Sequence, residues 1–284
     1  MLHSVLRLAA LTIAVALATA TGHAQETAGR VAVDEAIRSS DSDLAKQLSN
    51  PIADLISVPF QLNYNDGYGA DGDGSQTYLN VQPVIPFSIS SSWNVISRTI
   101  VPIVSQDGLI PGEGSQFGFG NTTQSLFFSP KKPAEIGDLK MVWGVGPAFQ
   151  IPTATDGIAN NQWTAGVTGV ALTQEGPWTV GALANHLWSV SGNDKFGGVS
   201  ATFLQPFVSY TTPKATSFTL NTESTYDWRN EQWSVPINAV VSQVVKIGER
   251  PVQFGLGARY WADAPEFGPE GWGGRFQVTL LFPK

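Results

Sequence analysis

The sequence predicts an all-β chain: a closed antiparallel transmembrane β-barrel of about 12 strands, with a short N-terminal periplasmic segment. Three observations predict this class. Long segments alternate between apolar and polar residues, the connections alternate between long and short, and the tryptophans lie near the segment ends. Each observation matches a known property of barrels that cross a bilayer.

The first residues have the composition of a cleaved secretory signal peptide. Arg7 supplies a basic start, 8–20 is an apolar stretch too short to span a bilayer, and small residues precede Gln25. We therefore expect three parts. They are a signal peptide at 1–24, a periplasmic lead-in with a short helix at 25–55, and the outer-membrane barrel at 56–284.

Within the lead-in, the run SDSD over 40–43 can cap a short helix with Leu44 and Leu48 on one face, and Pro51 stops it. The stretch 41–55 has two interpretations. It plugs or gates the barrel lumen, or it is a loosely held lead-in without further role. The sequence favours the second, because chain ends are commonly poorly held.

The predicted strands come from period-two alternation, which places apolar and polar side chains on opposite faces. In the first segment Phe60, Leu62 and Tyr64 alternate with Gln61 and Asn63. Each segment is about 10–14 residues long, and about 9–11 tilted residues cross a bilayer. Twelve is the best count, with ten or fourteen as alternatives. The segments are 56–65, 76–88, 93–105, 116–129, 139–151, 162–173, 177–190, 198–211, 216–228, 232–246, 251–262 and 272–283.

The connections fall into two alternating sets. One set is mostly long and rich in Gly, Asp and Asn: 66–75, 106–115, 152–161, 191–197, 229–231 and 263–271. The other is mostly shorter: 89–92, 130–138, 174–176, 212–215 and 247–250. Long loops at one rim and short turns at the other are typical of bacterial outer-membrane barrels, whose termini lie on the periplasmic, short-turn side.

The tryptophans and the low charge support a membrane barrel over a soluble β-sandwich. All nine Trp fall within a few residues of a predicted strand end, as in the aromatic girdles of membrane barrels. Only 14% of the residues are charged, against roughly 25% in soluble domains. A lipid-facing apolar side and a lumen of small polar residues together need few charges.

The composition excludes several classes of protein. No apolar run outside the first residues could form a set of membrane helices. A net charge of −7 disfavours a nucleic-acid partner, since phosphates need basic side chains. The chain has no Cys, and His186 is the one histidine left after signal cleavage. We therefore expect no disulfide, no thiolate or multi-histidine metal site, and no cofactor.

Several stretches resemble a known family of bacterial outer-membrane proteins. They are LAKQLSNPIADLISVPFQLNYN, LNVQPVIPFSISSSWNVISRTIVPI, GNTTQSLFFSPKK and NHLWSVSG. The family carries the general description "transporter" and is grouped with barrels assigned to the MetA pathway of phenol degradation. The resemblance covers about 44–284 and implies an outer-membrane β-barrel with a transport role. The chain departs from general outer-membrane barrels by ending Phe282-Pro283-Lys284. The barrel-assembly machinery, an expected partner, would have to tolerate this overhang.

Polar residues at lumen parity are the predicted selectivity site: Arg98, Glu223, Arg259, Arg275, Gln61, Asn63 and Gln277. Charged rings select solutes in pores, and Arg259 and Arg275 fall on adjacent strands. The alternative is an ion-pair network that fills the barrel, with Glu223 neutralising an Arg. Eight strands give a filled interior and sixteen to eighteen an open channel, so about 12 strands favour a narrow or occluded pore.

His186 is a weak candidate for catalysis. A barrel lipase needs a Ser nucleophile, a His base and an orienting polar group, and Asn185 and Ser189 lie nearby. Ser189 has the opposite parity, so its side chain points to the other face. We predict no catalytic residue and expect that the chain is not an enzyme. His186 is then an interfacial polar residue.

The long loops are strongly acidic, with twelve carboxylates against Lys195 and Arg229. A solvated rim that repels anions is the favoured interpretation. Divalent-cation binding is the alternative, but the spacing does not match a calcium loop. The carboxylates are Asp66, Asp71, Asp73, Asp107, Glu113, Asp156, Asp194, Asp227, Glu231, Asp263, Glu266 and Glu270.

The sequence thus predicts a passive outer-membrane transporter for small molecules, hydrophobic or aromatic ones included. Its expected partners are outer-membrane lipids, the assembly machinery and a small solute. Two hypotheses of other classes stay open: an outer-membrane enzyme of lipase type, and a structural or adhesive barrel that binds through its acidic loops.

Overall fold

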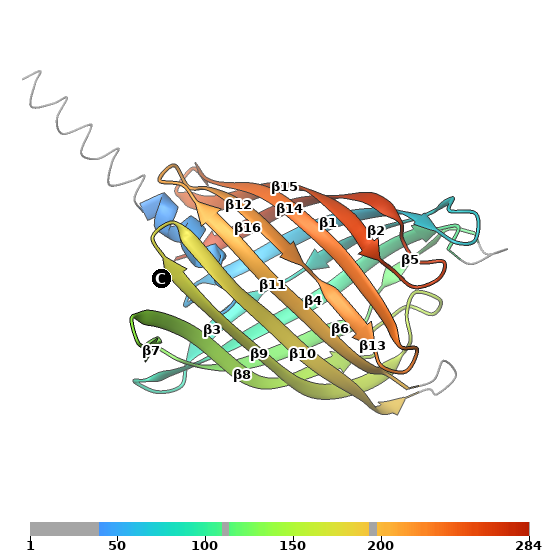
Figure 1. Ribbon diagram of the computed structural model, residues 1–284, viewed down its shortest axis with the longest axis horizontal. Helices are drawn as coiled ribbons and strands as arrows, with labels where there is room; N and C mark the ends of the chain where they lie inside the picture. The colour runs from blue at the N-terminus through green and yellow to red at the C-terminus, as the bar shows by residue number, and fades with distance from the viewer. Residues whose placement is uncertain (1–39, 110–113, 193–197, 284) are drawn as a thin grey trace, which may run out of the picture.

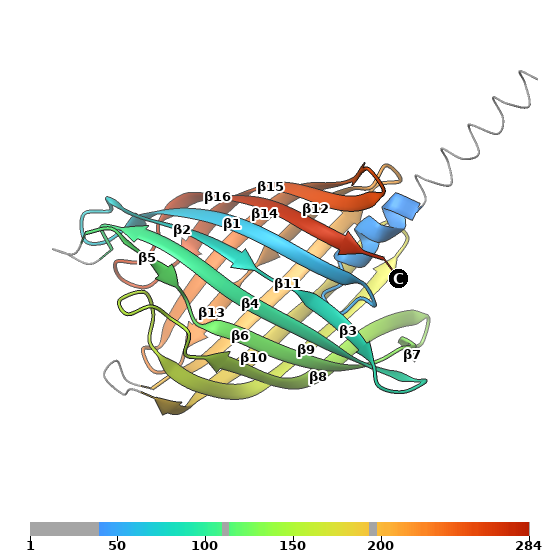
Figure 2. The same ribbon diagram turned by 180° about the vertical axis from the view of Figure 1, so that it is seen from behind.

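The structure is a computed structural model that describes residues 40–109, 114–192 and 198–283. The predicted signal peptide and the first part of the lead-in lie outside the described residues. Figure 1 shows strands running obliquely around one barrel, and Figure 2 shows the same barrel from behind. The all-β prediction is confirmed.

The described part of the chain contains sixteen strand segments in one antiparallel sheet. They are β1 (Ile56–Tyr68), β2 (Gly74–Val81), β3 (Val84–Ser88), β4 (Trp93–Asp107), β5 (Gln116–Phe119), β6 (Thr122–Pro130), β7 (Ala134–Ile136), β8 (Leu139–Ile151), β9 (Gln162–Glu175), β10 (Trp178–Gly192), β11 (Ser200–Thr211), β12 (Thr216–Thr222), β13 (Ser224–Asp227), β14 (Gln232–Ile247), β15 (Arg250–Asp263) and β16 (Gly271–Phe282).

Twelve strands form the wall of the barrel. The pairs β2–β3, β5–β6 and β12–β13 are each one strand with a short break, and β7 pairs with β8 alone in a connection. The first strand pairs with the last from Ile56 opposite Phe282 to Tyr64 opposite Gly274, which closes the sheet. The twelve predicted segments coincide with these strands to within a few residues.

Proline explains one of the breaks. The register places Glu223, between β12 and β13, opposite Pro236 of β14. The Glu223 amide donates to the Pro236 carbonyl at 3.4 Å, but proline has no N–H to return a ladder bond. The strand is interrupted there without losing register, and Glu223 takes the interior position that parity predicts.

The two faces of the wall differ as the alternation predicts. On β1, Leu62 and Tyr64 are 41% and 45% exposed on the outside, whereas Asn63 between them is fully buried. On β15, Leu256 is 70% exposed on the outside and Arg259 is 1% exposed inside. Closure of the sheet leaves no unpaired strand edge, and the exterior is apolar. Both are properties that a bilayer requires.

Most tryptophans lie outside near the strand ends, but Trp261 does not belong to a girdle. Its indole N–H donates to Asn65 Oδ1 at 3.2 Å, and Arg259 lies over its ring at 5.8 Å. Both partners are interior residues. The girdle prediction is therefore wrong for Trp261, which fills the lumen.

The interior also contains an apolar cluster on one side of the barrel. Ile96 of β4, Phe127 of β6, Val170 and Leu172 of β9, and Leu183 of β10 are buried together. These side chains share the inward parity of their strands. The expectation of a lumen lined by small polar residues therefore fails on this side, where large apolar groups pack as in a soluble core.

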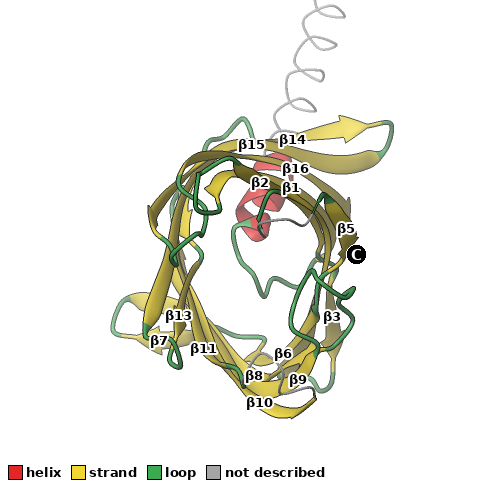
Figure 3. Cartoon of the chain, turned by 90° about the vertical axis from the view of Figure 1, so that its right-hand side faces the viewer, coloured by secondary structure: helices red, strands yellow, loops and turns green. Residues whose placement is uncertain are grey.

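The described part of the lead-in, residues 40–55, is here called the N-terminal segment. It lies at the end of the barrel that holds both described chain ends, here called the terminal end. A helix occupies 40–48, and Figure 3 shows it within the outline of the strand ring. Its Leu44 and Leu48 pack against a buried group of Ala45, Leu55, Ala215, Val244 and Leu281. No helix among the described residues is long and apolar enough to span a membrane.

Ile52, just after this helix, is 5% exposed and joins the apolar cluster of the opposite wall. Polar contacts add to the docking: Lys46 Nζ donates to the Gly176 carbonyl at 2.7 Å, and Gln174 Nε2 donates to the Lys46 carbonyl at 2.9 Å. A stretch packed in this way is not loosely held. The expectation that the stretch 41–55 is loosely held is therefore wrong, and its role as a plug or gate stays a prediction.

Candidate functional site

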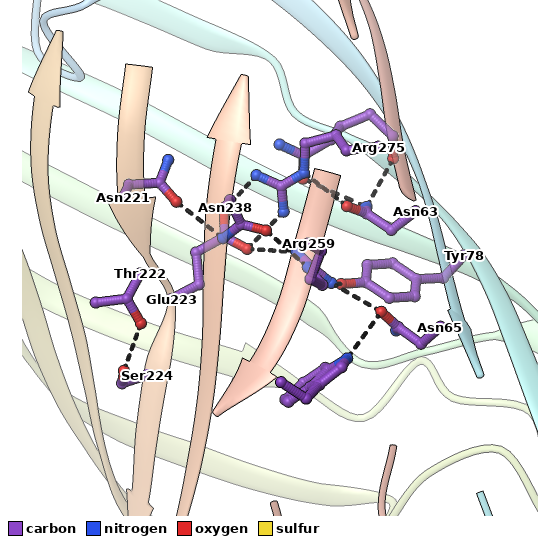
Figure 4. Close-up of polar contacts among 12 residues, drawn as sticks. Asn63, Asn65, Tyr78, Asn221, Thr222, Glu223, Ser224, Asn238, Arg259 and Arg275 are labelled. Carbon is purple, nitrogen blue, oxygen red and sulfur yellow. Dashed lines mark hydrogen bonds and ion pairs between the residues drawn. The ribbon is translucent and has the colours of Figure 1, made fainter. Parts of the chain in front are cut away.

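A charged layer crosses the polar half of the interior, and Glu223 is its centre. Arg275 binds the carboxylate through two bonds, from Nη1 to Oε1 at 2.9 Å and from Nη2 to Oε2 at 2.6 Å. Arg259 Nη2 donates to Oε2 at 2.9 Å. Figure 4 shows both guanidinium groups converging on Glu223. We call these three residues the charged layer.

Amide side chains hold the two arginines in place. Arg259 Nε donates to Asn238 Oδ1 and Arg275 Nε donates to Asn63 Oδ1, both at 2.7 Å. The hydroxyl of Tyr78 accepts from Arg259 Nη1 at 2.5 Å. Arg259 and Arg275 are 1% and 3% exposed. Their orientations are therefore fixed by contacts from other strands as well as by Glu223.

Local sequence explains how two long side chains fit side by side. In the β15–β16 ladder, Arg275 lies opposite Gly257, and Arg259 lies opposite Gly273. A Cβ added at Gly273 would lie 2.4 Å from the Tyr64 carbonyl oxygen, so this position is restricted to glycine. Each arginine thus has a cross-strand neighbour with no side chain, which leaves room for its guanidinium to reach inward.

Arg98 faces the same interior but stands outside the charged layer. Its Nη2 donates to Gln82 Oε1 at 3.1 Å, and Gln82 Nε2 in turn donates to Gln61 Oε1 at 3.3 Å. Asn63 Nδ2 donates to the Gln61 carbonyl at 3.2 Å. A chain of amides therefore connects Arg98 with Asn63, which orients Arg275.

A cavity of about 210 Å³ lies between the charged layer and the N-terminal segment. Its lining includes Arg98, Glu223 and Arg275. Six amide side chains of the wall also line it: Gln61, Gln82, Gln205, Asn221, Gln253 and Gln277. Residues 47–51 of the N-terminal segment close it toward the terminal end.

All seven residues of the predicted selectivity site face the interior. The structure brings Glu223, Arg259, Arg275 and Asn63 into one network, as the neighbouring positions of the two arginines suggest. Gln61 and Gln277 line the cavity, and Gln277 Nε2 donates to Thr279 Oγ1 at 3.0 Å. The network fills part of the lumen, and the cavity lies beside it.

His186 faces outward, on the opposite side of the wall from the charged layer. Its Nδ1 lies 2.7 Å from Thr202 Oγ1, and its Nε2 lies 3.5 Å from Ser200 Oγ. Trp228 Nε1 donates to the same Thr202 hydroxyl at 2.8 Å. Ser189 donates to Gln162 inside the barrel at 2.6 Å, so the predicted separation of His186 and Ser189 is confirmed.

The described residues contain no group of three or more His, Cys, Asp or Glu side chains that could hold a metal ion. The loop carboxylates Asp71, Asp73, Asp107 and Asp156 are exposed. Glu113, Asp194 and Lys195 lie outside the described residues.

The fold has a match among solved structures. An outer membrane channel from Pseudomonas putida F1 is similar at 15% identity and a TM-score of 0.61, over 80% of this chain and 94% of that chain. The two chains share one fold. The chain matches no family model and no curated protein sequence.

Two phospholipase structures overlap less well with this fold. Outer membrane phospholipase A from Escherichia coli has 9% identity and a TM-score of 0.47, over 80% of this chain and 96% of that chain. The Salmonella typhi phospholipase dimer with bound calcium has 10% identity and a TM-score of 0.48, over 87% of this chain and 98% of that chain.

Sequence reasoning missed several members of the interior network. Asn65, Asn238 and Gln82 are polar residues at inward parity, and extending the alternation by two positions from Asn63 would have found Asn65. Tyr78 and Trp261 were harder to find, because aromatic residues in a membrane barrel are expected on the lipid side. Here both lie over the guanidinium of Arg259, at 5.9 and 5.8 Å.

Proposed function

We propose that this chain is an outer-membrane channel for the passive passage of small molecules, hydrophobic or aromatic ones included. The observation that carries the proposal is the cavity beside the charged layer, inside a closed barrel with an apolar exterior.

The interior architecture supports a narrow pathway. Charged and amide side chains line one half, whereas the apolar cluster fills the other. A passing solute then follows the polar half and meets the charged layer, and fixed charges at a constriction select by charge and size. The N-terminal segment narrows the terminal end, so it regulates access from that side.

Reconstitution tests the proposal. The folded full-length barrel is inserted into planar bilayers and into liposomes, and single-channel conductance and sugar-driven swelling are recorded. We expect small, discrete conductance steps and uptake restricted to the smallest solutes. A correctly folded barrel, verified by its heat-dependent gel mobility, that shows neither conductance nor swelling rejects a channel.

A second candidate, a lipid hydrolase, rests on the outward group of Ser200, His186 and Thr202. The hydroxyl and the imidazole are at hydrogen-bond distance on the lipid-facing side. The Thr202 hydroxyl also accepts the Trp228 N–H and is neutral, so it stabilises an imidazolium less well than a carboxylate does.

Phospholipid hydrolysis by the reconstituted barrel, compared with Ser200→Ala and His186→Ala, tests this candidate. Hydrolysis lost in both variants supports it. Absence of hydrolysis in the parent, or hydrolysis unchanged in both variants, rejects it.

A further inference from the structure

We propose that the interior cavity is a binding site for a small organic acid, whose carboxylate pairs with Arg98 and whose apolar body lies against the N-terminal segment. The inference deepens the proposed function by naming the class of solute. Passage of the acid through the barrel rests on the proposed channel function, whereas its binding rests on the cavity alone.

The first argument is the balance of charge. Three arginines, Arg98, Arg259 and Arg275, face this part of the interior against one carboxylate, Glu223. Of the residues that line the cavity, Arg98 and Arg275 are basic and Glu223 is acidic. Both oxygens of Glu223 are already engaged by Arg275 and Arg259. Among the described residues that line the cavity, the basic groups therefore exceed the acidic ones by one positive charge.

The second argument is the state of Arg98. Arg259 and Arg275 each have a carboxylate and an asparagine as partners. Among the described residues, the Arg98 guanidinium donates to Gln82 alone, and no carboxylate lies within ion-pair distance of it. A guanidinium carries five N–H donors in a planar fork that matches a carboxylate. Most of these donors remain available in a partly enclosed space, where an unpaired charge is costly.

The third argument is the arrangement of the lining. Amides surround the arginine end, with Gln61 and Gln82 in contact with each other and Gln277 nearby. Leu48 and Leu55 of the N-terminal segment, with Val84 and Phe207 of the wall, give the lining its apolar part. A ligand that satisfies both parts is an anion with a compact apolar body.

The size of the cavity limits the ligand. Drug-sized ligands occupy pockets of roughly 300–1,000 Å³, and this cavity measures about 210 Å³. A single-ring or short-chain carboxylate is therefore the class to test. Benzoate is a suitable probe, and benzamide is its uncharged counterpart of almost the same shape.

The experiment measures block of the channel current. The full-length barrel is reconstituted in planar bilayers, and benzoate or benzamide is added during recording in potassium chloride. We expect benzoate to reduce the chloride current in a saturable manner and benzamide to act much more weakly. Arg98→Gln should raise the half-blocking concentration of benzoate about tenfold or more, since a charge-assisted contact is lost. Arg98→Lys, which keeps the charge but loses the fork, should lie between.

The matched control is Arg250→Gln, which removes the same charge from an exposed turn at the start of β15. It should leave the block unchanged. Equal block by benzoate and benzamide, equal block by inorganic phosphate, or an unchanged half-blocking concentration in Arg98→Gln overturns the carboxylate site.

Calorimetric titration of the detergent-solubilised barrel with benzoate separates this inference from the channel assignment. Binding that Arg98→Gln abolishes, in a barrel that does not conduct, supports the site and rejects the channel. Conduction without benzoate binding rejects the site and leaves the channel in place.

Discussion

The inner wall of this barrel has two halves that follow the same alternation and differ in content. On β4, β6, β9 and β10 the inward positions include Ile96, Phe127, Leu172 and Leu183, which pack together with Ile52. On the other half, β12 to β16 with β1 and β2, the inward positions hold the charged layer and its amides. Strand periodicity therefore decides which side chains point inward. The residue types at the inward positions decide whether that half of the interior is packed with apolar groups or lined by polar ones.

We expect the largest loss of stability from a substitution in the charged layer of the polar half. Glu223→Gln leaves Arg259 and Arg275 as buried cations without a carboxylate, and breaking a buried ion pair costs about 3–5 kcal/mol. Urea unfolding of the refolded barrel in lipid vesicles measures the loss. The double variant Glu223→Gln with Arg275→Gln removes one of the orphaned cations and should recover part of it. A loss below about 1 kcal/mol would show that the layer behaves as a solvated surface network.

A smaller effect should follow from breaking the apolar half at Ile52. Ile52→Ala leaves a gap against Ile96 and Phe127, and a buried Ile→Ala change costs about 2–5 kcal/mol. The cost falls on docking of the N-terminal segment, so trypsin should cut faster after Lys46 and the mean conductance should rise.

Asp43→Ala is the control for this change, because Asp43 is an exposed residue on the adjacent helix. Its cleavage rate and conductance should match those of the parent. Unchanged cleavage in Ile52→Ala would mean that the segment stays docked without the apolar contact.

The smallest effect concerns the ion pair that joins the helix to the rim. Lys246 Nζ lies 3.4 Å from Asp41 Oδ1, and the side chains are 38% and 17% exposed. Pairs of this kind contribute about 0–1 kcal/mol and are screened by salt. Lys246→Gln should therefore change the unfolding midpoint slightly at low salt and not at high salt. A loss as large as that of Ile52→Ala would mean that charge, not packing, holds the segment.

The strand layout was predictable because water and lipid on opposite faces force period two on every strand. Leu62 and Asn63 show this most directly, since one is exposed outside and the other is fully buried. The apolar cluster was harder to predict from the sequence. Phe127 lies in a run of three apolar residues, Leu126 to Phe128, where alternation cannot assign a face.

Contacts between side chains of distant strands also could not be predicted from the sequence. The alternation places Arg98, Glu223, Arg259 and Arg275 on the inside, but strand tilt and register decide which of them meet. Arg275 reaches Asn63 of the first strand, and Arg98 stops at Gln82. Docking of Ile52 in the apolar cluster depends on a loop path after the helix that no periodicity encodes.

Closure of the first strand against the last has a consequence for the order of folding. Ile56 pairs with Phe282, so the contact joins residues more than two hundred positions apart, and such contacts form late because loop closure is entropically costly. The arginines that neutralise Glu223 arrive on the last two strands, and Leu281 packs with Leu55. Glu223 is therefore neutralised, and the N-terminal segment docked, only after the final hairpin of β15 and β16 has formed. Either event indicates that the barrel is complete.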